Sequence, residues 1–532
     1  MRQPRYGDVQ VTAIRLTMDG SNPGWRWFRW RGASRRIAVS IGTLVALLGG
    51  CQVGPDFARP APPGTATYIL ANATPNLAPG GGEPHQRLVV NQAIPAAWWE
   101  LFRSPSLDNV VRQAIAGSPT IEAAKATLAQ AQQLVLQTQG AYYPQLDAAA
   151  AAERQRGPAF GLGLLPSHTL PTYNLYSLGP SVSFTPDVFG LIARQVEQQE
   201  AQAENQAYEL VAAQLTVTGN TVAEVLTIAS VRLQIDAVDG IIADDETNLA
   251  LVQQLFAAGK VNRTDLLLAE AELANDRTLL PPLRQQVAAA EDALAVLVGK
   301  SPAEWHPFAF ALADFTLPAE LPLSLPSALV RQRPDILAAE AQLHAHSAAI
   351  GVATAQMYPN FPLSASVGTA ALTSNSLFEG SSVVWTLTSG LTAPIFHGGA
   401  LMAQKQAAIE AFRASLATYR QTVLGGLGQV ADLLRALGHD AELVEAERRA
   451  VDASEGALAL ERITYAAGKT RVLDLLSAER DYQQARVGYA RARGQRYLDS
   501  AQLLVALGGG GWWGGRNPIA SSAARSSPGN IP

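Results

Sequence analysis

The chain of 532 residues is poor in cysteine and in aromatic residues, and its net charge is small. Its single cysteine, Cys51, cannot form an intramolecular disulfide and is too isolated to suggest a metal site. A net charge of −5, with no lysine-rich block beyond the N-terminal region, argues against a nucleic-acid-binding protein. No run of about 18 or more apolar residues follows that region, which excludes ordinary transmembrane helices and leaves a β-barrel open.

Motifs of common catalytic sites are missing as well. We find no nucleophile elbow, no phosphate-binding loop and no HExxH sequence. His344 and His346 stand two positions apart on an expected helix, so they point to different faces, and no third ligand lies at a suitable spacing. We therefore expect neither an enzyme nor a metal-binding protein.

A duplicated stretch organises the rest of the chain. The motif Phe256-Ala-Ala-Gly-Lys260 returns as Tyr465-Ala-Ala-Gly-Lys469. Four pairs of residues are each separated by 209 positions: Lys260 and Lys469, Asp265 and Asp474, Glu270 and Glu479, Gly299 and Gly508. In each copy a glycine lets the chain leave one helix, and a second helical segment follows. The spacing predicts two structural repeats, each with a helical hairpin.

Alternating sequence predicts two strands in each repeat. In the first repeat Tyr176, Leu178, Val182 and Phe184 alternate with small or polar residues, after a turn region at 157–171. In the second repeat the apolar positions are Phe361, Leu363, Ala365 and Val367, followed by Val383, Trp385, Leu387 and Leu391. Four strands cannot close a membrane barrel, because the smallest such barrels have about eight. Oligomerisation would resolve this: two chains give eight strands and three chains give twelve.

Long helices are expected after each pair of strands. About 65 residues of helical sequence, about 100 Å long, lead to each turnaround glycine. We expect glycines to bend or interrupt these helices: Gly219 and Gly240, then Gly425, Gly426, Gly428 and Gly438. The returning segment has apolar residues every seven positions, as in coiled coils, with Pro281-Pro282 interrupting the first copy only. Near the start, Ser106 is expected to cap a short helix, and Trp98 and Trp99 are expected in the core.

The N-terminal region resembles a bacterial lipoprotein signal. Five arginines precede the apolar run 37–48, and Leu48-Gly-Gly-Cys51 ends it with small residues. Cys51 would then carry a diacylglycerol and an N-acyl chain and begin the mature protein. An ordinary signal peptide with an incidental cysteine is the alternative, and Met18 is an alternative start to Met1.

These patterns predict the following division of the chain: a signal peptide at 1–50, an extended N-terminal segment at 51–97, a first repeat at 98–299, a linker at 300–326, a second repeat at 327–508 and a disordered tail at 509–532.

Ordered motifs between Cys51 and about Gly508 carry a family resemblance. They are Val53-Gly-Pro-Asp56, Trp98-Trp-Glu-Leu-Phe102, Leu294-Ala-Val-Leu-Val-Gly-Lys-Ser-Pro302, Arg333-Pro-Asp-Ile-Leu-Ala-Ala-Glu340, Met357-Tyr-Pro-Asn360 and Pro394-Ile-Phe-His-Gly-Gly399. The chain resembles the outer membrane factors of tripartite efflux pumps, in the NodT-type lipoprotein branch related to TolC. The resemblance implies a mainly α protein that forms a homotrimer, with a twelve-stranded β-barrel in the outer membrane and a periplasmic α-helical barrel. It also implies two protein partners, a periplasmic adaptor and an inner-membrane RND-type pump.

Site residues follow from the same resemblance. Asp474 matches an acidic ring that closes the periplasmic end, and Asp265 matches a position that bonds a tyrosine, for which Tyr465 is the match. Some relatives have a second acidic residue where this chain has Ser477, and a basic partner where it has Thr470, beside Arg471. The tips expected to face the adaptor comprise six residues: Ala258, Gly259, Lys260, Ala467, Gly468 and Lys469. Helix N-terminal charge is the alternative role for the two aspartates, and a solvated helix tip is the alternative for the six tip residues.

The resulting hypothesis is an outer-membrane channel that passively exports small molecules for an efflux pump. Two alternatives remain at this point: a periplasmic coiled-coil lipoprotein without a pore, and a duct for secreted polypeptides. The alternating strands argue against the first, because a scaffold does not need them.

Overall fold

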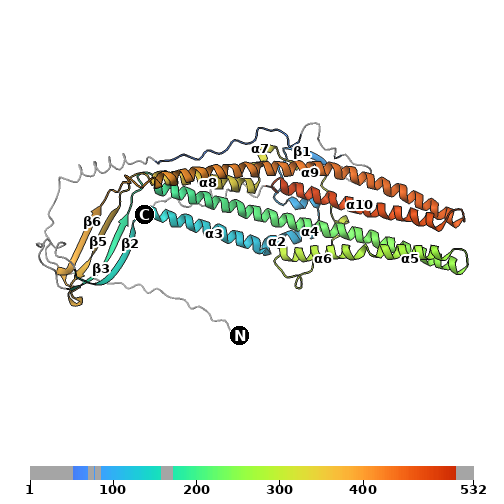
Figure 1. Ribbon diagram of the computed structural model, residues 1–532, viewed down its shortest axis with the longest axis horizontal. Helices are drawn as coiled ribbons and strands as arrows, with labels where there is room; N and C mark the ends of the chain where they lie inside the picture. The colour runs from blue at the N-terminus through green and yellow to red at the C-terminus, as the bar shows by residue number, and fades with distance from the viewer. Residues whose placement is uncertain (1–51, 70–76, 78–85, 157–171, 511–532) are drawn as a thin grey trace, which may run out of the picture. The chain divides into compact units, whose positions relative to one another are not determined.

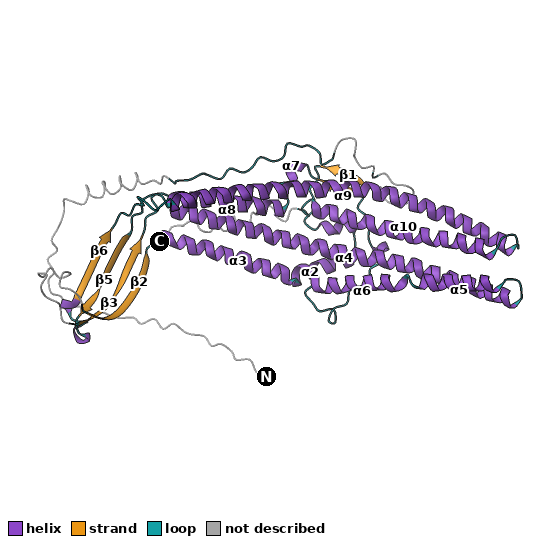
Figure 2. Cartoon of the chain, in the orientation of Figure 1, coloured by secondary structure: helices purple, strands orange, loops and turns teal. Residues whose placement is uncertain are grey.

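A computed structural model describes residues 52–69, 77, 86–156 and 172–510 (Figure 1). Within these ranges the chain is mainly helical, with two β-sheets (Figure 2). None of the helices in the described ranges is both long enough and apolar enough to cross a membrane. Cys51, the turn region 157–171 and the C-terminal residues from 511 lie outside the described residues.

The two repeats contain matching elements in the same order. The first has α2 (Pro105–Gly117), α3 (Pro119–Gln139), β2 (Gln145–Gln155), β3 (Tyr173–Phe184), α4 (Leu191–Ala257), α5 (Arg263–Arg277) and α6 (Leu280–Leu297). The second has α7 (Pro326–Leu329), α8 (Pro334–Ala355), β5 (Leu363–Ala371), β6 (Val383–Ser389), α9 (Ala400–Ala466) and α10 (Val472–Ala506). In each repeat the strands lie at one end of the long helices, and the helical turnaround lies at the other (Figure 1).

Proline sets the first residue of several helices. Pro119 begins α3 and Pro334 begins α8, because the missing N–H of proline has no partner in a first turn anyway. The predicted cap of α2 is wrong by two residues. Its N-cap is Ser104, and Pro105 is the first helical residue.

The long helices α4 and α9 are both 67 residues and run without interruption. We expected the glycines to bend or interrupt these helices; the interruption is wrong, and the bend stays a prediction. Gly219 and Gly426 instead let other elements approach closely: a Cβ at Gly219 would lie 3.0 Å from Val505 Cγ2, and one at Gly426 would lie 3.2 Å from Arg333 Nε. The helices tolerate these glycines because tertiary packing contributes stability that offsets the low helix propensity of glycine.

The returning helices differ between the repeats. In the first repeat α5 ends at Arg277 and α6 begins at Leu280, with Pro281 and Pro282 in the first turn of α6. In the second repeat α10 is a single helix of 35 residues. The predicted interruption in the first copy only is confirmed.

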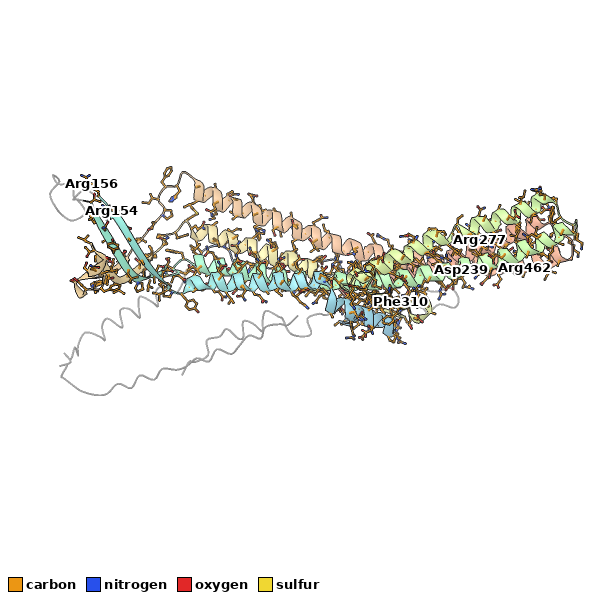
Figure 3. All side chains as sticks on the ribbon, turned by 90° about the horizontal axis from the view of Figure 1, so that it is seen from below. Arg154, Arg156, Asp239, Arg277, Phe310 and Arg462 are labelled. Atoms are coloured by element: carbon orange, nitrogen blue, oxygen red, sulfur yellow. The ribbon has the colours of Figure 1, made fainter. Side chains whose placement is uncertain are left out.

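The four predicted strands form one antiparallel sheet in the order β2-β3-β5-β6. Its register places Leu146, Val182, Ala365 and Leu387 side by side across the sheet, so they share one face. Serine, threonine and glycine dominate the opposite face of β3, β5 and β6, as predicted. Arg154 lies near the end of β2 that is far from the helices, with Arg156 just beyond it (Figure 3).

A second, two-stranded sheet was not predicted. β1 (Arg87–Val90) pairs in parallel with β4 (Glu320–Leu323), so the segment before the first repeat contacts the segment between the repeats. Each strand has only four residues and little alternation, which is too short for a periodicity argument.

The main hydrophobic core joins the N-terminal segment to both repeats. Trp98 is fully buried, and it packs in one cluster with Phe102, Leu226 and Leu503, which come from different elements. The predicted core role of Trp98 and Trp99 is confirmed.

Candidate functional site

The two helical turnarounds have the same backbone geometry. Gly259 and Gly468 both have φ of +69°, a left-handed conformation that glycine adopts without steric cost. Beside Gly259, the Lys260 N–H donates to Leu255 O at 2.9 Å; at the second turnaround, the Lys469 N–H donates to Thr464 O at 3.0 Å. Each helix therefore ends in a Schellman motif, and both tips are built in one way.

The aspartates Asp265 and Asp474 cap the helices that leave the tips. The Asn262 N–H donates to Asp265 Oδ2 at 3.1 Å, and the Arg471 N–H donates to Asp474 Oδ2 at the same distance. These bonds satisfy an N–H that would otherwise lack a partner at a helix N-terminus. Both aspartates also stand in the first turn of their helices, as the alternative role of a helix N-terminal charge requires, and the capping bonds are an additional finding.

Arg471 also lies beside Asp474 as an ionic partner. Its Nε is 3.5 Å from Asp474 Oδ2. The backbone hydrogen bond from Arg471, and then its guanidinium, lower the pKa of Asp474. The carboxyl is therefore ionised at neutral pH in the single chain, which is the state that a ring of negative charges requires.

Tyr465 turns into a small apolar cluster at the tip. It packs with Leu249, Val252 and Leu476, so the cluster contains residues of both hairpins. Its hydroxyl is buried and has no hydrogen-bond partner among the described residues. Burial raises the pKa of Tyr465, and the charge of Asp265 raises it further. The structure thus brings Tyr465 near Asp265, while the bond between them stays a prediction.

The six tip residues named from the sequence are all exposed: Ala258, Gly259, Lys260, Ala467, Gly468 and Lys469. Two departures from the family pattern lie close by. Ser477 is exposed on α10, and Thr470 Oγ1 is 3.3 Å from Thr464 Oγ1, within the turnaround. The tips present backbone and two lysines to solvent.

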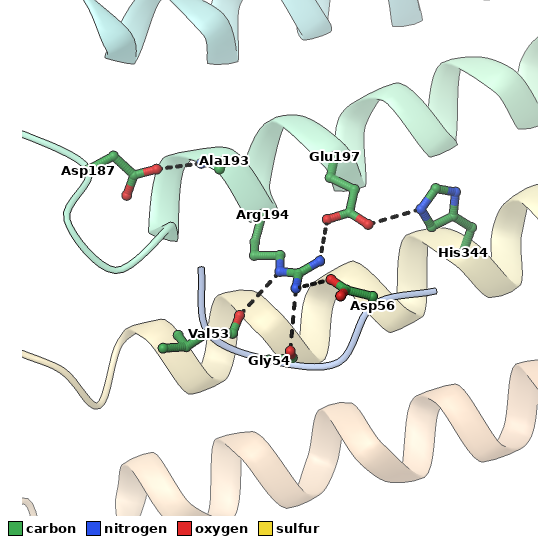
Figure 4. Close-up of polar contacts among 8 residues, drawn as sticks. All are labelled: Val53, Gly54, Asp56, Asp187, Ala193, Arg194, Glu197 and His344. Carbon is green, nitrogen blue, oxygen red and sulfur yellow. Dashed lines mark hydrogen bonds and ion pairs between the residues drawn. The ribbon is translucent and has the colours of Figure 1, made fainter. Parts of the chain in front are cut away.

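A buried arginine that the sequence argument missed holds the segment just after Cys51 (Figure 4). Only 2% of the Arg194 side chain is exposed. Its guanidinium donates to Val53 O at 3.2 Å, to Asp56 Oδ1 at 2.8 Å and to Glu197 Oε2 at 2.7 Å. The motif Val53-Gly-Pro-Asp56 is one of those on which the family resemblance rests, and the sequence did not indicate what it does. In the structure it is the segment that Arg194 binds.

The same network reaches the second repeat. Glu197 Oε1 is 3.0 Å from His344 Nε2 on α8, and the His344 ring stacks on Phe57 at 4.4 Å. A side chain at Gly54 would clash with Gly351 of α8, since its Cβ would lie 2.5 Å from the Gly351 Cα. The segment after Cys51 is thus fixed to α4 and to α8. Among the residues that the structure covers, no three His, Cys, Asp or Glu side chains group as a metal site.

Comparison with protein families matches residues 110–300 and 325–509 to the model of outer membrane efflux proteins. The pyoverdine export outer membrane protein OpmQ of Pseudomonas aeruginosa is 30% identical over 332 residues, which are 62% of this chain and 69% of the relative. The toluene efflux pump outer membrane protein TtgF of Pseudomonas putida is 29% identical over 402 residues, or 75% of this chain and 81% of the relative. The cation efflux system protein CusC of Escherichia coli is 26% identical over 390 residues, or 73% and 80%.

Known structures agree with this match. The outer-membrane channel OprN superposes with a TM-score of 0.77 at 28% identity, over 86% of this chain and 99% of that one. The CmeC outer membrane channel of Campylobacter jejuni has the same TM-score at 19% identity, over 86% and 95%, which supports the fold alone. The predicted TolC-like fold class is confirmed.

Proposed function

Because the chain belongs to the outer membrane efflux protein family, it is an outer-membrane channel component of an efflux system, and we propose that it exports small molecules passively through a homotrimeric duct. The observation that carries the proposal is the pairing of a sheet that is apolar on one face with a bundle of 67-residue helices ending in two matched tips. The chain has no catalytic role in this function. The pump that supplies the energy is a separate protein.

Oligomerisation is supported by the edges of the four-stranded sheet. β2 and β6 each pair on one side only within the described chain, and an unpaired edge cannot face lipid. On the apolar face, Trp385 and Leu387 of β6 are both 75% exposed in the single chain. Three copies would close twelve strands into a barrel, turning this face to lipid and the Ser/Thr/Gly face to a water-filled lumen. The trimer rests on the family resemblance and these unpaired edges together.

Asp474 is proposed as the closing residue at the periplasmic end. Three copies meeting at the axis would place three ionised carboxylates close together, which favours cations and resists anions. Arg471, Asp265 and Tyr465 belong to the same closing region, through the ion pair of Arg471 and the position of Tyr465 beside Asp265. The exposed tips, from Ala258 to Lys260 and from Ala467 to Lys469, are proposed to contact a periplasmic adaptor that links the duct to an RND-type pump.

The chemistry of the cargo is best supported as that of small molecules or ions. The relatives are named for pyoverdine, toluene and cations. A polypeptide duct is therefore less well supported, and a scaffold without a pore does not agree with membership of a channel family.

Lipid attachment at Cys51 is proposed as a second membrane contact. Gln52 packs against Gly190, which directly precedes α4, and the Val53 N–H donates to Phe189 O at 3.3 Å. The residues next to Cys51 are therefore fixed where β3 gives way to α4. Acyl chains attached at Cys51 would start close to the helix-side end of the sheet.

Single-channel conductance of the purified protein in planar bilayers tests the proposed duct. We expect small, cation-selective currents from the parent and larger currents, several-fold, from Asp474→Ala. Asp481→Ala is the matched control, because it removes the same charge from an exposed position two turns along α10. The absence of any conductance from parent and variant, with a folded oligomer demonstrated, would contradict the duct.

A further inference from the structure

A pair of carboxyl groups lies buried where the two hairpins meet, away from the tips. Asp245 of α4 is only 4% exposed, and its carboxyl group interacts with that of Asp276 of α5, whose Oδ2 is also buried. Gln483 of α10 donates to Asp245 Oδ1 at 3.0 Å. The Asp245–Asp276 pair therefore ties the first hairpin together and touches the returning helix of the second.

If both carboxyl groups of this pair were ionised, their buried oxygens would lack a hydrogen-bond donor. Asp245 Oδ2 and Asp276 Oδ2 are buried, and neither receives a hydrogen bond from an N–H or O–H of the described residues. Two carboxylates cannot donate to each other, and two such charges side by side in a buried site repel. One proton between the two groups supplies the missing donor and removes one of the charges.

Charged groups surround the pair from each neighbouring helix. Glu479 of α10 is buried and bonds both Asn248 of α4 and Arg462 of α9, the latter at 3.0 Å. Arg480 of α10 donates to Glu272 of α5 at 2.9 Å. The charge of Asp244 of α4 adds to the effect of burial in raising the pKa of Glu479. The acidic residues near the pair thus outnumber the basic ones. Both basic residues, Arg462 and Arg480, already have acidic partners. Arg462 lies in the tip-side half of the hairpins (Figure 3).

We propose that the Asp245–Asp276 pair is a proton-binding site that holds the first hairpin against α10, so that loss of the proton separates α5 from α10. We refer to the contact between α10 and the α4–α5 hairpin as the seam. With the proton bound, the Gln483 amide and the shared proton join α10, α4 and α5 in one network. When the proton leaves, two buried negative charges remain beside Glu479, and separation lets water reach them.

The direction of the pH effect follows from linkage. Burial, and then the hydrogen bond with Asp276, raise the pKa of Asp245 to about 8, compared with 3.8 for a solvated aspartate. Burial also raises the pKa of Asp276 and of Glu479. Because the closed seam binds a proton that the open seam releases, the seam is most stable below about pH 4 and weakens as pH rises toward about 8. The Coulombic effect of Arg480 on Asp276 opposes this trend without reversing it.

The test measures the seam distance directly. Spin labels would be attached in the full-length protein through Asn275→Cys on α5 and Ser477→Cys on α10, both exposed positions, and diluted with unlabelled protein. An Asn275→Cys variant alone sets the background from Cys51. Pulsed electron paramagnetic resonance between pH 4 and pH 9 then gives the ratio of long to short distances. We expect this ratio to rise by up to tenfold per pH unit until about pH 8.

Two variants decide the outcome. Asp245→Asn keeps the acceptor for Gln483 and supplies a permanent donor toward Asp276, so its distance ratio should not change with pH. Asp276→Asn tests the same point from the other side if the first variant fails to fold. Asp440→Asn is the matched control: it neutralises another buried aspartate, within the α9–α10 hairpin, and should keep the parent's response.

A parent whose distances do not change over this range would overturn the proposal, as would an equal pH response in Asp245→Asn. The measurement needs no pore, so its failure is distinguishable from failure of the proposed duct. Where the tips close the duct, the bound proton favours the closed state.

Discussion

The α4–α5 hairpin and the α9–α10 hairpin are alike at their tips and different in their interiors. The Schellman turns and the aspartate caps match between the two copies. The buried carboxyl groups do not. Asp440 and Asp499 of the second hairpin correspond to the buried apolar residues Val231 and Ala290 of the first.

The carboxyl pair of the first hairpin likewise has no counterpart in the second. Asp245 and Asp276 of the first hairpin correspond to Ser454 and Ala485 of the second. A turn requires one backbone conformation, so both copies have the same turn residues. An interior position requires only that any buried polar group has a hydrogen-bond partner, so its residue can differ between the copies. The duplicated tips thus preserve a shared geometry, whereas each hairpin has its own buried carboxyl groups at positions that are apolar or neutral in the other.

The largest expected effect tests whether matched core positions contribute equally. Leu294 of α6 and Leu503 of α10 are equivalent in the repeats and fully buried. Leu294→Ala and Leu503→Ala should each lower the free energy of unfolding by about 2 to 5 kcal/mol, because each leaves a cavity in the main core. Thermal and denaturant unfolding of the purified protein measure this. Val296→Ala, at an exposed position, should change the free energy of unfolding little. A loss there as large as at Leu294 or Leu503 would contradict the claim that burial in the core causes the effect.

A second prediction concerns the carboxyl pair that only the second hairpin has. Burial, and then its hydrogen bond with Asp499, raise the pKa of Asp440 to about 7, against the attraction of Arg496. The contribution of Asp440 to the free energy of unfolding is therefore fully present below about pH 4. It is lost as pH rises toward 7, by up to about 1.4 kcal/mol per pH unit. Asp440→Asn should flatten that part of the pH profile of unfolding. An unchanged slope in the variant would contradict this assignment.

The shared tip geometry gives a smaller effect with a clear sign. Gly259→Ala and Gly468→Ala should each destabilise by about 1 kcal/mol, because alanine is strained at φ of +69°; no atom lies near enough to clash with the added Cβ. Gly456→Ala, at an exposed helical position of α9, should instead stabilise by about 0.5 to 1 kcal/mol. Melting temperatures of the three variants give the comparison, and one sign for all three would refute it.

The smallest effect concerns the break between α5 and α6. Replacing Pro281 and Pro282 by alanine should join the two helices, as in α10, and change global stability by less than about 1 kcal/mol, because prolines in a first turn cost little. Hydrogen exchange should slow at residues 277–283 and stay unchanged at the equivalent residues 486–492. Unaltered exchange at 277–283 would mean that other contacts impose the break.

Much of the fold was predictable because it depends on local and periodic signals. Residues 209 positions apart predicted the repeats, and alternation predicted the two hairpins of the larger sheet, with the correct faces for β3, β5 and β6. Pro281-Pro282 predicted the break in one repeat only. The glycines of α4 and α9 do not interrupt these helices, and Gly219 stands where Val505, from a distant part of the chain, approaches α4.

The candidate site divides in the same way. Asp265 and Asp474 were identifiable because they stand at fixed distances from the turnaround glycines. Arg194 was not, because its partners Val53 and Asp56 lie about 140 positions earlier and carry no periodic signal. Asp245 and Asp276 were missed for a related reason: aspartates on helices are usually solvated, and only packing shows that Asp245 and the Oδ2 of Asp276 are buried.

By itself, the sequence of this protein determined its helical hairpins, strands, repeats and turns, since each depends on residues close together or on a regular period. Tertiary structure alone decided which polar groups lose water and which partners replace it. That decision depends on the distances between side chains of separate helices, and these arise only when α4, α5, α8 and α10 pack together. The raised pKa of Asp245 and the binding of the N-terminal segment by Arg194 are consequences of that packing.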